Sequence, residues 1–418
     1  MYCLPLSFIY KIKKVIAVDY NNYEFYFNGF LGKKIVIWAN KNSLPTLEKY
    51  KFLLNKIHYI VVVEKELWGK KFYGIPIIGP QEIVLNKNKD RFVVLNLIKE
   101  YWKSATNFLY KYGVYQVAPL NLFQSMAPYT KQIEDIQTTS PKNNRKLEND
   151  VAIVVRGMFD PFFTPLVLKQ IRINYPNHYV VLSTWDDTPS KLLKNIYADH
   201  IILNKKPEYK GKGHRNYQIQ CVTSALEFLK KDNFKEIFIQ RTDQMFFRNK
   251  LIDRCKLLLE EYPNNIGYLK NRIITSNLYF RKYYLYNSSD LFMYGNIDDL
   301  LCYWEAPFDA RSVEEIPNFH QIVENRNIQK SDLVDFYRNE ESVESYLFKN
   351  MMMKFNYEFK YTLEEWLHLA SNLFIIRDTQ WWDVFWYKPS LFNGTIQNFK
   401  EGHPLELIDQ LDWEDMQI

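Results

Sequence analysis

The chain has 418 residues, a mass of 50.4 kDa and a formal net charge of +6. This length exceeds what one hydrophobic core usually organises, so we expect two domains, and the 47% of hydrophobic residues is ample for folded cores. No apolar run is long enough to span a membrane, the first residues lack a signal-peptide cleavage site, and the four cysteines lie far apart. We therefore expect a cytoplasmic chain with reduced thiols, and no motif for nucleic acid occurs.

Positive charge is concentrated in the first third of the chain. Residues 1–148 contain 22 Lys and Arg against 11 Asp and Glu, whereas the remaining residues contain 32 against 37. A basic N-terminal part followed by an acidic C-terminal part is typical of a protein that binds an anionic surface, which predicts peripheral contact with the inner membrane. A solvated, lysine-rich surface would give the same excess.

Residues 1–123 are expected to form a small Rossmann-like α/β domain. An Asn28-Gly29 pair between strand-like runs predicts a tight turn. From Lys33 onwards, expected strands alternate with expected helices, and such alternation predicts a parallel sheet with covering helices. The expected strands are 33–38, 58–64, 91–98 and 114–119, and the expected helices are 46–54 and 103–111.

The segment 69–83, GKKFYGIPIIGPQEI, resembles an element of small Rossmann-like domains attached to enzymes of bacterial surface polysaccharides. The first turn after a strand, 39–43, contains no glycine, and without glycine the backbone cannot approach a pyrophosphate closely. We therefore expect a degenerate domain that has lost dinucleotide binding and serves in docking or stabilisation. Residues 124–149 are polar and without sustained apolar periodicity, which is typical of a linker.

Residues 150–418 are expected to form the second domain, in which strands and helices alternate again. Expected helices are 165–174, 190–196 and 217–230, and a further strand is expected at 200–204. Three strands end in polar clusters, namely Arg156-Gly157, the run from Ser183 to Asp187, and the run from Arg241 to Gln244. Because α/β sheets bind their ligands at the carboxyl ends of the strands, we expect a site there.

The stretch EIFIQRTDQMFF, 236–247, is the centre of this expected site. Its apolar residues predict a buried strand, after which Arg241 and Asp243 point to the same face because they are two residues apart. An ionised Asp beside an apolar core needs a partner. That partner is either Arg241, in a salt bridge that closes the strand end, or a divalent metal that carries phosphate oxygens.

Four motifs, VVRG, LSTWDD, GHRNYQIQCVTSAL and QRTDQ, resemble in this order and spacing the WavE lipopolysaccharide-synthesis family, over roughly 150–418. The resemblance implies a GT-A-like glycosyltransferase on a Rossmann-type mixed sheet, with a nucleotide-sugar as co-substrate and Mn²⁺ or Mg²⁺ at an Asp-x-Asp motif. The chain departs from that motif, because Arg241 stands where the first Asp would be. A metal would therefore be held weakly, or Arg241 would replace part of its charge.

The resemblance also implies which residues bind the donor. They are Arg156, Gly157, Thr184, Trp185, Asp186, Arg215, Asn216, Gln218, Arg241 and Asp243. The lysine-rich loop 205–215 precedes an expected helix, where a phosphate would be favoured, but a solvated surface loop fits its composition equally well. Asp186 and Asp187 could accept hydrogen bonds from a ribose or base, or cap the next helix.

An inverting transferase needs a carboxylate that takes the proton of the acceptor hydroxyl. Asp290 follows a polar turn and precedes an apolar run, and Glu341 and Glu344 lie three apart, hence on one helix face. Each could instead be a helix cap or a surface charge. His403 could be a late metal ligand or structural, and the tryptophans in 366–386 could stack on sugars or fill the core.

The function that we expect is transfer of a sugar from a nucleotide-sugar to a lipopolysaccharide or capsule glycan, or to a lipid-linked glycan. Asp243 and His403 are the candidate metal ligands, and Asp290, Glu341 and Glu344 are the candidate catalytic residues. Two other classes remain open: a non-catalytic module that binds a nucleotide or glycan, which needs no acceptor-side carboxylate, and a metal-dependent sugar nucleotidyltransferase, which would release pyrophosphate.

Overall fold

The computed structural model describes residues 34–48, 54, 57–86, 92–97, 102–114, 117–119, 136, 139, 147–311, 332–338, 341–387 and 407–417. It divides into two compact units. The first comprises Met1–Thr139 and Tyr387–Thr395, and the second Ser140–Trp386 and Ile396–Ile418. The expected turn at Asn28-Gly29, most of the expected linker and His403 lie outside the described residues.

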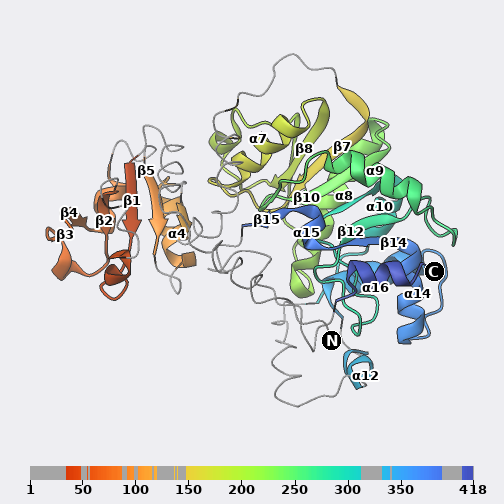
Figure 1. Ribbon diagram of the computed structural model, residues 1–418. Helices are drawn as coiled ribbons and strands as arrows, with labels where there is room; N and C mark the ends of the chain where they lie inside the picture. Colours follow the sequence, from red (N-terminus) through yellow and green to blue (C-terminus); the bar gives the residue numbers. More distant parts are fainter. Residues whose placement is uncertain are drawn as a thin grey trace, which may run out of the picture. The chain divides into compact units, whose positions relative to one another are not determined.

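The first unit contains a six-stranded sheet in the order β3-β4-β2-β1-β5-β6 (Figure 1). Its strands are β1 (Lys34–Trp38), β2 (Ile57–Val61), β3 (Lys71–Phe72), β4 (Ile75–Ile78), β5 (Phe92–Asn96) and β6 (Val117–Pro119). All pairings are parallel except that between β3 and β4. Helices are η3 (Lys65–Leu67), α3 (Pro80–Val84) and α4 (Trp102–Lys111). Ala105 and Leu109 of α4 belong to one buried cluster with Val36 and Val94 of the sheet. A helix that covers a parallel sheet is the arrangement expected from the alternation of strands and helices in the sequence.

The glycine-rich segment 69–83 serves packing in this unit. A Cβ on Gly79 would lie 2.8 Å from the Trp68 ring, so only glycine fits beneath that ring. The Trp68 indole N–H donates to the Val62 carbonyl at 2.9 Å, and Glu82 accepts from the Gly79 N–H at 3.1 Å. Gly79 therefore ties the loop after β2 to the start of α3.

The second unit contains a seven-stranded mixed sheet in the order β14-β12-β13-β10-β7-β8-β9. The strands are β7 (Glu148–Arg156), β8 (His178–Trp185), β9 (His200–Asn204), β10 (Glu236–Arg241), β12 (Ile273–Ser276), β13 (Met293–Asn296) and β14 (Phe374–Arg377). Strands β7 to β10 are mutually parallel, and β13 runs antiparallel to both of its neighbours. A second sheet pairs β11 (Gln244–Phe246) with β15 (Val384–Trp386). The fold is thus mixed α/β and Rossmann-like, as predicted.

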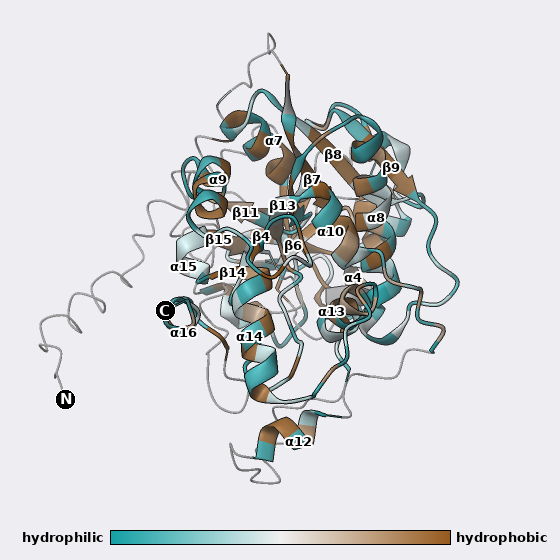
Figure 2. Ribbon diagram, turned by 90° about the vertical axis from the view of Figure 1, so that its right-hand side faces the viewer, coloured by the Kyte–Doolittle hydropathy of each residue, from teal (hydrophilic) through white to brown (hydrophobic). Residues whose placement is uncertain are grey.

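The second unit also contains α-helices and 3₁₀ helices, several of which pack on the seven-stranded sheet. They are α7 (Thr164–Asn174), η6 (Ser190–Leu193), η7 (Lys212–His214), α8 (Arg215–Lys231), α9 (Leu251–Glu261), α10 (Ile297–Trp304), α12 (Leu333–Tyr337), α13 (Val343–Met353), α14 (Leu363–Leu373), α15 (Thr379–Trp382) and α16 (Gln410–Asp415). Helix α8 packs on β7, β8 and β9, and α10 packs on β10, β13 and α8. Figure 2 shows β8 and β9 largely hydrophobic, whereas α14 carries hydrophilic segments. No helix within the described ranges is long and apolar enough to cross a membrane.

One helix expected from the sequence is much shorter in the structure. The segment 190–196 forms only the 3₁₀ helix η6, which starts after Pro189 and gives way to extended backbone at Lys194. Asn195 then adopts φ 59°, a left-handed conformation that an α-helix does not continue through. Because Pro189 and Asn195 bracket five residues, no full α-helix forms there.

The strand order creates a switch point between β7 and β10. From β7 the chain adds β8 and β9 on one side, and then returns to place β10 on the other side of β7. Connections therefore diverge at the carboxyl ends of β7 and β10, where open α/β sheets bind ligands in a crevice. Arg156 and Arg241, the last residues of the two strands, are paired in register at this edge.

Candidate functional site at the carboxyl ends of β7 and β10

The backbone at the switch point is held close by a glycine. Gly157 has φ +120°, and a Cβ there would lie 3.3 Å from the Thr242 hydroxyl oxygen. The Gly157 N–H donates to the Ser183 carbonyl at 3.0 Å, and the Thr242 hydroxyl donates to the Met158 carbonyl at 2.7 Å. These bonds fix the loops that follow β7 and β10 side by side.

Arg241 and Asp243 form a bidentate salt bridge at the end of β10. The Arg241 Nε and Nη2 atoms donate to the two Asp243 carboxylate oxygens at 2.8 and 3.0 Å. The guanidinium also lies 5.5 Å from the centre of the Trp386 ring. Burial lowers the pKa of Arg241, but Asp243 more than offsets that effect, so the pKa lies above its ordinary value. The salt-bridge alternative is therefore present, on side chains that are 23% and 18% exposed.

Arg156 is a buried cation at the end of β7. Its Nη1 donates to Gln218 Oε1 at 3.0 Å, and its Nη2 donates to the Asp290 carbonyl at 2.7 Å and lies 3.8 Å from the Asp290 carboxylate. The guanidinium lies over the Trp304 ring, 5.1 Å from its centre, while Nε has no hydrogen-bond partner in the described part of the chain. Burial lowers the pKa of Arg156 to about 10, opposed by Asp290. Arg156 therefore stays charged at neutral pH.

Two predicted catalytic carboxyl groups interact at this site. Burial raises the pKa of Glu344 to about 7, the negative charge of Asp290 adds to the rise, and Arg281 opposes it. Asp290 itself is 4% exposed, and its Oδ2 accepts no hydrogen bond from any described residue. Glu344 lies in the first turn of α13, whose N-cap Ser342 accepts from the Ser345 N–H at 2.9 Å. The structure thus brings Asp290 and Glu344 together although 54 positions separate them in the sequence.

Asp160 and Tyr279 belong to the same electrostatic cluster, and neither was predicted. Burial raises the pKa of Asp160 to about 6, which the N–H groups of Phe163 and Phe162 oppose and the charge of Asp243 reinforces. Burial also raises the pKa of Tyr279, which is influenced by Arg281, Glu344, Arg241 and Asp290. An Asp-Pro pair that begins three residues beyond the VVRG motif was the available signal for Asp160; Tyr279 carried none.

Arg215 and Asn216, at the start of α8, bond to residues elsewhere in the chain. Arg215 pairs with Glu341 and Asp309, and Asn216 bonds to the Asp309 carbonyl. Arg215 is fully buried, and its Nη1 lies 2.8 Å from Glu341 Oε2 and 3.4 Å from Asp309 Oδ2. The Asn216 amide donates to the carbonyls of Tyr209 and Asp309 at 2.9 and 2.8 Å. These side chains join the start of α8 to the start of α13. Such bonds within the chain are typical of side chains that hold segments together, and the donor-binding role of Arg215 and Asn216 and the catalytic role of Glu341 stay predictions.

The remaining predicted donor residues lie at the end of β8, directly after it, or in the first turn of α8. Thr184 is fully buried, and its hydroxyl has no partner within the described residues. Trp185 packs against Tyr217 with ring centres 5.0 Å apart, and Gln218 accepts from Arg156. Asp186 is exposed, and its N–H donates to the Asn204 carbonyl. Of these four residues, only Gln218 forms a hydrogen bond with Arg156.

The described side chains fit a divalent metal poorly. Both Asp243 oxygens already accept from Arg241, and the described ranges contain no group of three or more His, Cys, Asp and Glu that could hold a metal. Hard divalent cations prefer several oxygen ligands. The Mn²⁺ or Mg²⁺ expected from the sequence therefore stays a prediction, as does the role of His403.

Among the tryptophans of the segment 366–386, Trp366 and Trp382 are fully buried and so fill the core, which the sequence had left open. Trp386, 4% exposed, forms the floor beneath Arg241.

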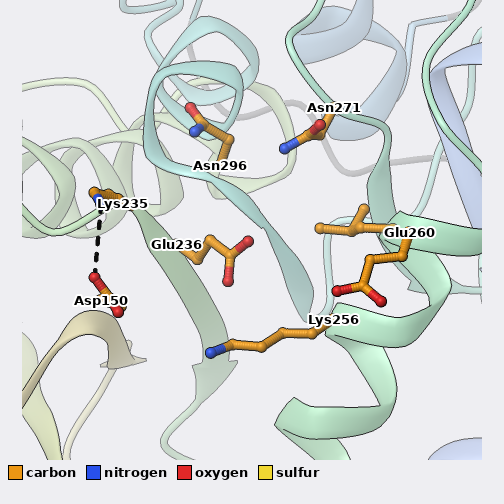
Figure 3. A pocket seen from close by; sticks show the side chains of 8 residues that line it. Asp150, Lys235, Glu236, Lys256, Glu260, Asn271 and Asn296 are labelled. Atoms are coloured by element: carbon orange, nitrogen blue, oxygen red, sulfur yellow. Dashed lines mark ion pairs between the residues drawn. The ribbon is translucent and has the colours of Figure 1, made fainter.

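A separate cavity of about 440 Å³ lies at the amino end of β10 (Figure 3). Glu236 begins β10 and Asn296 ends the antiparallel β13, so this cavity lies at the end of the sheet opposite to Arg156 and Arg241. Its lining mixes Lys235 and Lys256 with acidic residues, and Glu236 accepts from the Tyr294 hydroxyl at 2.6 Å. Two lysines face three acidic side chains in this lining, a charge that does not suit a diphosphate, and the cavity is not at the switch point. We therefore place the functional site elsewhere.

A family model described as WavE lipopolysaccharide synthesis matches residues 158–388. The chain belongs to the WavE family. The resemblance to this family is confirmed over residues 158–388, which contain three of the four motifs, and membership indicates a role in lipopolysaccharide synthesis. The matched WavE region contains Asp160, Arg241, Asp243, Asp290 and Glu344, whereas Arg156 lies just before it. No curated protein matches the chain.

Proposed function

We propose that this WavE-family protein is a glycosyltransferase that moves a sugar from a nucleotide-sugar to a hydroxyl group of a lipopolysaccharide glycan. One observation carries the proposal: at the switch point of a Rossmann-like sheet, two arginines meet two carboxyl groups that interact electrostatically. The cations suit a leaving diphosphate, and the carboxyl groups suit a reacting hydroxyl. The mixed sheet supports a GT-A-like catalytic core.

The diphosphate of the donor would bind beside Arg156 and Arg241. Negative charge grows on the leaving nucleoside diphosphate as the glycosidic bond breaks, and fixed cations in a partly buried site stabilise that charge. Arg156 Nε has no hydrogen-bond partner among the described residues, and Gly157 permits close approach of the backbone at the end of β7. Asp243 orients Arg241 through two hydrogen bonds, so its role here is to position a cation.

Glu344 would act as the general base for the acceptor. The acceptor oxygen forms a bond to the anomeric carbon, the bond from that carbon to the diphosphate oxygen breaks, and the hydroxyl proton passes to the Glu344 carboxylate. A pKa of about 7 matches a base that works near neutral pH. Asp290 would contribute by holding Arg156 and by raising the pKa of Glu344.

A turnover assay with a panel of sugar nucleotides tests this proposal. The purified full chain is incubated with each donor, with Mg²⁺, Mn²⁺ or a chelator, and release of nucleoside diphosphate is measured. We expect Asp243→Asn to lower kcat/KM at least tenfold, because the amide cannot hold Arg241 through two charged hydrogen bonds. Asp253→Asn removes an exposed charge on α9 and serves as the matched control.

Undiminished turnover by Asp243→Asn would remove the positioning role of Asp243. Release of pyrophosphate would favour a nucleotidyltransferase, and donor binding without turnover would favour a non-catalytic module.

A further inference from the structure

Arg281 is a cation beside the proposed catalytic carboxyl groups that the proposed donor chemistry does not use. It lies between β12 and β13, and its guanidinium is 5.6 Å from the centres of the Tyr279 and Tyr284 rings. Within the described residues this guanidinium forms no hydrogen bond and no ion pair, in contrast to Arg156, Arg215 and Arg241. Its backbone is fixed, because its N–H donates to the Asn287 carbonyl and its carbonyl accepts from the Trp366 indole.

The two tyrosines hold Arg281 at the acceptor side of the site. Tyr284 is 2% exposed and stacks on Tyr337 of α12 with ring centres 4.7 Å apart. Tyr279 meets Trp386, the floor beneath Arg241, edge-on at 6.4 Å. Tyr279 thus lies between Arg281 and Arg241. The Trp366 indole, which donates to the Arg281 carbonyl, packs edge-on against Phe348 at 5.3 Å, one turn along α13 from Glu344. This packing brings Arg281 near the proposed base, in agreement with its effect on the pKa of Glu344.

A partly buried arginine with aromatic rings against it and no acid bound to it retains its full set of five N–H donors. Such a fork suits a phosphate or a carboxylate, which can accept two parallel hydrogen bonds. We infer that Arg281 binds an anionic group on the acceptor, so that the substrate is a negatively charged sugar whose hydroxyl lies against Glu344. This inference rests on the proposed function and adds the acceptor's chemical class to it.

Binding of matched glycosides tests the inference. Three probes are used: a neutral methyl hexoside, its 6-phosphate and its 6-carboxylate. Dissociation constants are measured by saturation-transfer NMR for the wild type, Arg281→Gln and Arg281→Lys. We expect the wild type to bind at least one anionic probe about tenfold or more tightly than the neutral one, and Arg281→Gln to lose that preference. Arg281→Lys should restore part of it, and the 6-phosphate and 6-carboxylate arms separate the two anions.

Donor binding is measured on the same variants without any acceptor. Unchanged affinity for the nucleotide-sugar in Arg281→Gln is expected, because Arg156 and Arg241 hold the diphosphate. Lys282→Gln, which removes the same charge from the next residue, is the control; its ammonium pairs with Asp412 at 2.9 Å. A wild type that binds donor but shows no anionic preference, or an Arg281→Gln variant that loses donor affinity equally, overturns the inference. Absence of donor binding in the wild type overturns the proposed function instead.

Discussion

The raised pKa of Glu344 predicts how stability and activity depend on pH. A pKa difference of one corresponds to about 1.4 kcal/mol. The rise from the ordinary 4.5 to about 7 therefore corresponds to about 3 kcal/mol, which solvent screening at this partly exposed side chain reduces to about 2 kcal/mol. The folded chain binds the proton more tightly than the unfolded chain, so this contribution is present below pH 4.5 and is lost as the pH rises to about 7.

Glu344→Gln removes this titration without changing the shape of the side chain. The free energy of unfolding of the variant minus that of the wild type, both measured with urea, should therefore increase by about 2 kcal/mol from pH 4.5 to pH 8. The same substitution should lower kcat by about 10² or more, because a general base is lost. In the wild type, kcat/KM should rise with pH through about 7, where the base loses its proton. Stability and activity are thus expected to respond in opposite directions.

The difference between the two proteins matters more than either curve, because titrating groups that do not interact with Glu344 cancel in it. Glu358→Gln, at an exposed position, is the control and should show no pH-dependent difference in stability from the wild type. Equal unfolding free-energy differences between wild type and Glu344→Gln at pH 4.5 and pH 8 would refute the raised pKa. A loss of activity without the pH-dependent gain would then have to come from another role of Glu344.

Two further predictions concern the partners of these residues. Asp290→Asn should move the rise of kcat/KM to lower pH, because the charge that helps to raise the pKa of Glu344 is gone; an unshifted pH profile would contradict their interaction. Arg215→Ala should lower the free energy of unfolding by about 3 kcal/mol, because Asp309 would lose a buried partner; urea denaturation beside the exposed pair variant Lys235→Ala measures it, and equal small losses would argue against a structural role.

The sequence predicted the strands of the switch point because their signal is local. Buried parallel strands need unbroken apolar runs, and β7, β8 and β10 each have one that ends at a polar residue. The polar ends could therefore be assigned to one edge of the sheet before the structure was known. The length of the helix expected at 190–196 was overestimated for a local reason as well. Asn195 ends it by adopting a left-handed conformation, and an Asn in the sequence indicates a helix end less clearly than a proline does.

The choice of partners within the site could not be predicted from the sequence. Arg215 bonds to Glu341, 126 positions away, and Arg156 bonds to the Asp290 carbonyl, 134 positions away. Both pairs depend on how α13 and the segment before β13 pack, and no spacing rule extends over such distances. Residues of one predicted motif consequently separate: Gln218 joins Arg156, whereas Arg215 and Asn216 hold Asp309.

The difference between Asp290 and Glu344 follows from what compensates each carboxylate. The Asp290 carboxylate lies 3.8 Å from the buried Arg156 guanidinium, which also donates a hydrogen bond to the Asp290 backbone carbonyl. The negative charge of Asp290 therefore stabilises Arg156 where the diphosphate would bind. Burial and the negative charge of Asp290 raise the pKa of Glu344, whereas the charge of Arg281 and hydrogen bonds from the Glu344 N–H and from Ser342 lower it. Because an anionic acceptor group would engage Arg281, that opposition would weaken when the acceptor binds. Glu344 would then hold a transferred proton more firmly, which is the property that the proposed general base requires.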